Sequence, residues 1–135
     1  MRRLLIGLGM IASLASVSAY ADKIVLDLKD YDDDLMKDLD RTIKYFEPDI
    51  AGQNGDAVAD DAKVLAEGFA YTEQYFKKKG NYPDAIKWSQ EGNAHVAAVL
   101  KYVASNNYDA AVLEARAAVQ QCKNCHEVYK PVTAR

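Results

Sequence analysis

The most reactive side chains of the sequence lie together near its C-terminus, in the segment CKNCH at residues 122–126. Cys122 and Cys125 are the only two cysteines of the 135-residue chain, and His126 is one of its two histidines. In a helix these residues occupy positions i, i+3 and i+4, so their side chains project from one face. Two thiols and an imidazole on one face can bind a metal ion, form a redox pair or bond to a prosthetic group.

The spacing favours covalent attachment of haem. The two thiols add to the two vinyl groups of a porphyrin, and the histidine beside the second thioether then lies under the iron as an axial ligand. Other interpretations stay open. A structural disulfide within one helical turn would close a very small loop, and a redox-active dithiol expects a preceding strand. A zinc site needs four ligands, and only His95 could join these three.

Four segments carry the helical period of apolar residues, and no segment alternates like a strand for long. We expect helices at residues 30–46, 56–79, 83–105 and 108–129, with Pro48 ending the first. Short connections favour antiparallel neighbours, so the predicted fold is all-α, an up-down-up-down four-helix bundle with haem on the last helix. The expected inward residues of the last two helices are Ile86, Asn93, Val96, Leu100, Val103, Val112, Ala115, Val119, Cys122 and His126.

Residues 1–21 have the pattern of a cleaved signal peptide. Arg2 and Arg3 precede an apolar run, and Ala19 and Ala21 occupy the positions that a signal peptidase reads. An uncleaved membrane anchor is the alternative, but the apolar run is short for a spanning helix. We therefore expect one exported domain at residues 22–135, located in the periplasm and not membrane-bound after cleavage.

The charge balance indicates the kind of partner. The chain has 17 Lys and Arg against 20 Asp and Glu, and removal of Arg2 and Arg3 leaves a net charge of about −5. Nucleic acid is therefore not an expected partner. The expected partner is a redox protein with a basic docking surface. The acidic run at residues 30–34 also suits the start of a helix, because the helix dipole favours negative charge there.

A second iron ligand is expected on the first predicted helix. After residue 21 the chain offers one methionine, Met36, and one histidine besides His126, namely His95. In an up-down bundle the last helix ends where the first begins, so Met36 and His126 both lie roughly 6 to 9 Å from the same end. His95 lies roughly 18 Å from it, which is too far. We expect Met36 to face His126 across the haem, although a core methionine is the simpler alternative.

The same estimate of distance from the end of the bundle places other side chains near the expected haem. Thr72, Tyr75 and Phe76 lie near the end of the second predicted helix, and Trp88 lies near the start of the third. Thr72, Phe76 and Trp88 are therefore candidate packing partners of the porphyrin. Aromatic residues on an apolar stripe also serve as ordinary core, so this assignment is less specific than that of the ligands.

The segment CKNCHEVYK, on the last helix behind a signal peptide, resembles the class II c-type cytochromes, which include cytochrome c prime and its low-spin relatives. Tyr129 and Lys130 match the aromatic and basic residues that commonly follow the histidine in that family. In cytochrome c prime an apolar residue on the first helix faces the iron, whereas in the low-spin relatives a methionine does, and Met36 resembles that methionine. The chain is also similar to the small periplasmic b-type four-helix cytochrome. It departs from the family by being roughly two helical turns shorter between Trp88 and Cys122.

The sequence thus predicts a monohaem c-type cytochrome, with one covalent haem c whose iron is six-coordinate and low-spin through His126 and Met36. Its expected function is one-electron transfer without enzymatic activity. The resemblance also implies an alternative, a five-coordinate protein like cytochrome c prime that binds NO or CO. It further implies a possible homodimer through the first two helices. A haem-free helical adaptor is a third interpretation.

Overall fold

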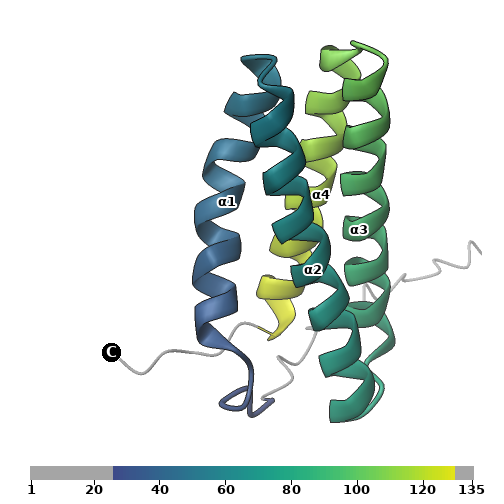
Figure 1. Ribbon diagram of the computed structural model, residues 1–135. Coiled ribbons are helices and arrows are strands. Elements are labelled where there is room, and N and C mark those ends of the chain that lie inside the picture. The colour runs from purple at the N-terminus through teal and green to yellow at the C-terminus, as the bar shows by residue number, and fades with distance from the viewer. Residues whose placement is uncertain (1–25, 130–135) are drawn as a thin grey trace, which may run out of the picture.

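The computed structural model describes residues 26–129, so the predicted signal peptide at 1–21, Lys130 and Pro131 lie outside the described range. The predicted all-α four-helix bundle is confirmed. Successive helices run in opposite directions, each packs against the next, and α1 also packs against α4 (Figure 1). The helices are α1 (Asp33–Ala51), α2 (Gly55–Lys79), α3 (Pro83–Ala104) and α4 (Tyr108–Tyr129). In the described part of the chain, none of them is both long and apolar enough to cross a membrane.

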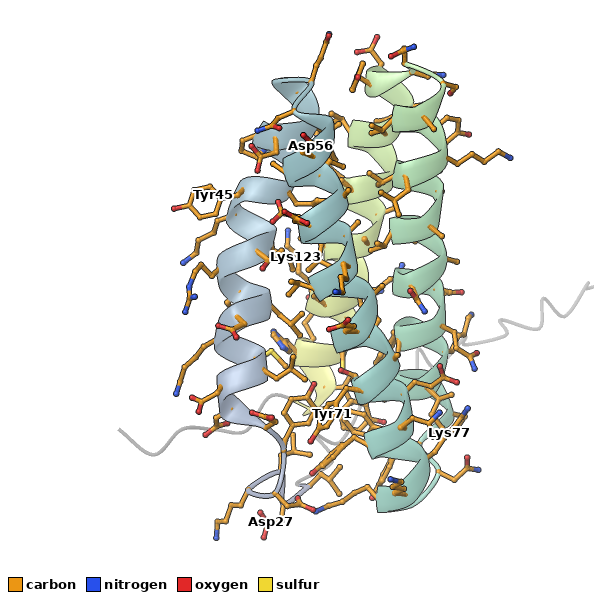
Figure 2. The ribbon with its side chains drawn as sticks, in the orientation of Figure 1. Asp27, Tyr45, Asp56, Tyr71, Lys77 and Lys123 are labelled. Carbon is orange, nitrogen blue, oxygen red and sulfur yellow. The ribbon has the colours of Figure 1, made fainter. Side chains whose placement is uncertain are left out.

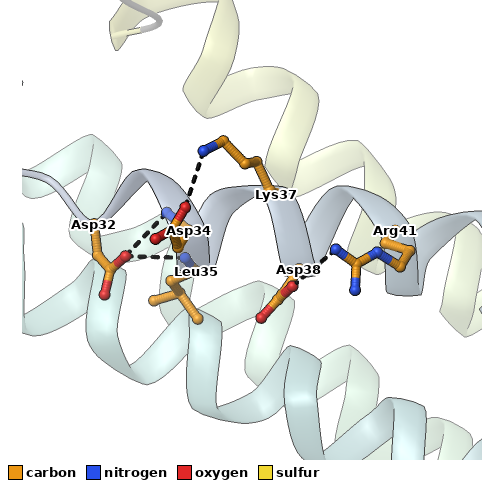
Figure 3. Close-up of polar contacts among 6 residues, drawn as sticks. All are labelled: Asp32, Asp34, Leu35, Lys37, Asp38 and Arg41. Carbon is orange, nitrogen blue, oxygen red and sulfur yellow. Dashed lines mark hydrogen bonds and ion pairs between the residues drawn. The ribbon is translucent and has the colours of Figure 1, made fainter.

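Helix starts follow the local chemistry of the sequence. Asp32 is the N-cap of α1, and its carboxylate accepts hydrogen bonds of 3.0 Å from the backbone N–H groups of Asp34 and Leu35 (Figure 3). Such caps satisfy donors that have no partner within the helix. Asn54 caps α2 in the same way. Pro83 begins α3, where its missing N–H and fixed φ are well tolerated.

The prediction that Pro48 ends the first helix is wrong, because α1 continues through it to Ala51. Proline within a helix removes one backbone hydrogen bond. In this protein the continued helix places Ile50, two residues after the proline, fully inside the core, and this burial favours the longer helix. The end is then closed by the N–H of Gly52, which donates to the carbonyl oxygen of Pro48 at 2.8 Å.

Each of the three connections is three residues long, at 52–54, 80–82 and 105–107. The middle residue of each adopts a left-handed backbone, with φ of 58° at Gln53 and 57° at Asn81 and Asn106. Asparagine tolerates this conformation because its short side chain can bond locally, whereas glutamine does so less well. Gln53 is therefore the connection residue under backbone strain.

We predict that Gln53→Gly raises the free energy of unfolding by about 0.5–1 kcal/mol, because glycine adopts positive φ without a Cβ clash. Gln53→Ala keeps the Cβ and is the matched control, so it should leave stability unchanged. Urea denaturation of both variants measures the effect. Equal stability of the two would contradict the proposed strain.

The buried core consists of two clusters along the bundle axis. The larger one lies toward the 52–54 and 105–107 connections and includes Phe46 and Ile50 of α1. The smaller one surrounds Phe76, Ala85 and Tyr129 at the opposite end. The α1–α4 pair makes the sparsest contacts of the four adjacent helix pairs. The bundle is therefore loosest along the seam between its first and last helices.

The inward faces of α3 and α4 differ in part from the predicted stripe. Leu100 was expected to face inward but is 41% exposed. Phe69 of α2 lies directly over Gly92, where an added Cβ would clash with the phenyl ring, so α3 turns its small residues toward α2. Small facing residues let helix axes approach closely. The buried residues of the two helices are Ala85, Ser89, Gly92, Val96, Val99, Ala111, Ala115, Ala118 and Tyr129.

Candidate functional site

A cavity of about 250 Å³ lies between the two core clusters and is lined by all four helices. Leu39, Leu65 and Phe69 border it on the side of the larger cluster, and Phe76 and Tyr129 border it on the other. Most of its wall is therefore apolar. The lining residues are Leu28, Tyr31, Asp33, Met36, Leu39, Asp40, Ile43, Leu65, Gly68, Phe69, Thr72, Phe76, Trp88, Ser89, Gln121, Cys122, Cys125, His126 and Tyr129.

The three residues of the CKNCH motif all line this cavity. They lie in the last two turns of α4, and the helical spacing directs them to one face. Cys122 packs against the larger core cluster and Cys125 against the smaller one, so the two thiols span the width of the cavity wall. His126 follows directly and also faces the cavity.

Both thiols are free and partly buried. Burial raises the pKa of Cys122 to about 11 and that of Cys125 to about 12, because a thiolate loses its hydration there. Redox-active cysteines show the opposite shift, since their thiolates are stabilised. Within residues 26–129, no three His, Cys, Asp or Glu side chains are arranged to hold a metal ion.

We predict that the thiols of the folded, haem-free protein react with iodoacetamide at pH 8 at least about tenfold more slowly than those of the unfolded chain, because a raised pKa leaves little thiolate. The raised pKa also links the thiols to stability. Their contribution is complete below pH 9, the ordinary thiol value, and is lost as pH rises toward 11–12. Mass spectrometry of alkylated protein measures the rates, and equal rates in 6 M guanidinium and in buffer would contradict the shift.

Met36 lines the same cavity from the facing side, on α1. The buried residues of α1, Phe46 and Ile50, both lie in its C-terminal half. Met36 and the rest of the N-terminal half are only partly covered or exposed. The cavity thus lies beside the half of α1 that has no buried residue.

The structure also shows where the other residues considered in the sequence analysis lie relative to the cavity. Thr72, Phe76 and Trp88 line the cavity, and their packing against a porphyrin stays a prediction. Tyr75 is not part of the wall, and its hydroxyl instead donates to Asp30 at 2.7 Å. His95 is also outside the wall, with its Nδ1 2.6 Å from Oε2 of Glu114 on α4.

Sequence reasoning missed several residues of the wall. Tyr129 lies three residues after His126, so helical spacing could have placed it on the cavity face. Its hydroxyl donates to Asp84 at the start of α3. Leu28 and Tyr31 come from the segment before α1, which is not helical and carries no periodic signal. Asp33 and Asp40 of α1 add exposed carboxylates at the edge of the cavity.

The cavity wall depends on glycine at position 92. We predict that Gly92→Ala lowers the free energy of unfolding by about 1–3 kcal/mol, since the new methyl group must displace the Phe69 ring. Gly55→Ala is the matched control, because open space surrounds that position. Thermal denaturation of the two variants measures the difference, and equal melting temperatures would contradict the close packing.

Comparison of the chain with protein-family models, with curated proteins and with solved structures gave no match.

Proposed function

We propose that this protein is an exported monohaem c-type cytochrome that transfers one electron. The observation that carries the proposal is that Cys122, Cys125 and His126 of α4 and Met36 of α1 line the same, mostly apolar cavity. These are the attachment and ligand residues of a His/Met haem. They come from opposite ends of the sequence, so their meeting in one cavity is a property of the fold.

The residues present fit a porphyrin in their chemistry. The two cysteines on successive turns would hold the macrocycle by thioether bonds, and His126 and Met36 would bind the iron. Phe76, a wall residue, would pack against the ring and exclude water. Bound haem supplies the one-electron couple of iron. The methionine sulfur favours the reduced state, so the potential should exceed that of a bis-histidine site.

The thiols support this proposal over the two rival uses of the motif. A disulfide between Cys122 and Cys125 would remain within one turn of α4 and constrain little of the fold. A redox dithiol needs a stabilised thiolate, whereas burial raises the pKa of both thiols. An apolar environment of this kind is compatible with cysteines that are converted to uncharged thioethers.

The charges near the cavity support a partner with a basic surface. Asp33 and Asp40 are exposed at its edge, and Asp32 and Asp34 flank the start of the same helix. Electrostatic steering by such a surface speeds the encounter of transient redox partners. The periplasmic location and the pairing of two copies through α1 and α2 stay predictions, and catalysis is not proposed.

A second candidate function is the binding of NO or CO by five-coordinate haem. The observation that favours it is the weak anchoring of α1 near Met36, which would ease displacement of the sulfur. Addition of CO to the reduced protein separates the two functions. A prompt spectral shift indicates gas binding, and an unchanged low-spin spectrum indicates electron transfer.

We predict that the protein, produced with a cytochrome c maturation system, carries covalent low-spin haem and that Met36→Leu converts it to a high-spin form that binds CO. Leucine keeps the apolar volume but cannot bind iron. Absorption spectra of the oxidised and reduced proteins measure the change. Leu35→Ala is the matched control, because Leu35 is partly buried on the same helix but does not line the cavity.

Two outcomes would contradict the proposal. A colourless product from maturation-competent cells would exclude haem and favour the helical adaptor. An unaltered spectrum and reduction potential in Met36→Leu would exclude Met36 as a ligand while leaving haem attachment intact.

A further inference from the structure

The segment before α1 lies at the end of the bundle that holds the smaller core cluster. We call residues 26–32 the N-terminal strap. In Figure 1, α2 and α3 extend beyond the end of α4, and the strap lies at this end. Leu26 and Leu28 pack against the smaller core cluster around Phe76, Ala85 and Tyr129. The strap therefore packs against the core at the end of the bundle where α4 stops short of α2 and α3.

Three residues on one stripe of α2 hold the strap: Thr72, Tyr75 and Lys79. Asp30 Oδ1 accepts hydrogen bonds of 2.7 Å from both the hydroxyl of Tyr75 and the ammonium of Lys79. The spacing of these residues, i, i+3 and i+7, places them on one face of the helix. The strap is thus bound at a defined position along α2.

The third contact joins Tyr31 to Thr72, with 2.7 Å between the two hydroxyl oxygens. The single hydroxyl hydrogen of Thr72 is donated to the carbonyl of Gly68 at 2.8 Å, so Tyr31 is the donor. Burial raises the pKa of Tyr31 to about 12, which keeps this donor protonated. Its ring also packs edge-on against Tyr71 and Tyr75, with centroids 5.2 and 4.9 Å away.

No residue of α1 before Phe46 is buried. Leu39 lies directly over Gly68, where a Cβ would clash with it, and the fully buried Phe46 and Ile50 are farther along the helix. Tyr31 is directly followed by the cap Asp32, whose carbonyl accepts from the N–H of Met36 at 3.1 Å. The first turn of α1 therefore connects Met36 directly to the strap.

We propose that Tyr31 and Lys79 are positioning residues, which anchor the strap on α2 and so hold the first turns of α1, with Met36, against the cavity. The inference rests on the proposed function where it concerns iron ligation. The anchoring itself concerns only residues of this chain. Because exposed ion pairs and single hydrogen bonds are individually weak, the strap sets an equilibrium between a docked and a released methionine.

The test uses the full, haem-loaded protein and its Tyr31→Phe and Lys79→Met variants. Tyr45→Phe and Lys77→Met are matched controls: Tyr45 is 60% exposed on α1, and Lys77 pairs with Glu73 within α2. Tyr45 points away from the bundle, whereas Tyr71, which touches Tyr31, lies near the strap (Figure 2). The two readouts are the affinity of the ferric protein for imidazole, which competes with Met36, and amide hydrogen exchange over residues 33–39.

The strap variants should bind imidazole about two- to tenfold more tightly than wild type, since one hydrogen bond or ion pair no longer favours the docked methionine. Exchange over residues 33–39 should accelerate by a similar factor, and both controls should match wild type. Strap variants that match the controls in both readouts would overturn the inference. A wild-type spectrum without methionine ligation would instead contradict the proposed function, while the exchange rates would still decide the anchoring.

Discussion

The structure depends on burial of apolar faces along a bundle whose core is interrupted near one end. Burial of Phe46, Ile50 and their neighbours fixes the helices at the opposite end. Beyond the interruption, Phe76, Ala85 and Tyr129 resume the core with aromatic contacts, such as the 4.9 Å between the rings of Phe76 and Tyr129. The cavity is the space between these two regions. On α1, the cavity lies beside the half of the helix that precedes the buried residues Phe46 and Ile50.

The fold could be predicted from the sequence because its signals are local and agree with one another. The apolar period, the caps at Asp32 and Asn54, and Pro83 all indicate the same helices. The end of the first helix could not be predicted, because burial of Ile50 outweighs the local effect of Pro48. The inward face of α3 was predicted wrongly in part, also because of tertiary packing. The packing of Phe69 on Gly92 is a contact between distant residues, which hydropathy does not report.

The candidate site was predictable where chemistry or helical spacing identified it. Cys122, Cys125 and His126 form a motif, and height along the bundle was enough to bring Met36 to the same cavity. The strap had no such signal, since its contacts come from Asp30 and Tyr31 to residues 41 to 49 positions away. A segment without periodicity reveals its role only when its tertiary contacts are known. Its importance for the site therefore came from the structure alone.

The seam between α1 and α4 carries an exposed ion pair, between Glu47 and Arg116, with Arg116 Nε 3.0 Å from Glu47 Oε1. This pair lies beside Phe46, in the well-packed half of the molecule. Swinging the first helix outward about this point would leave α2, α3 and α4 as an intact three-helix unit. It would also uncover a slot along one side of the bundle. In the proposed cytochrome, such a slot would admit a flat macrocycle edge first while the other three helices stay folded.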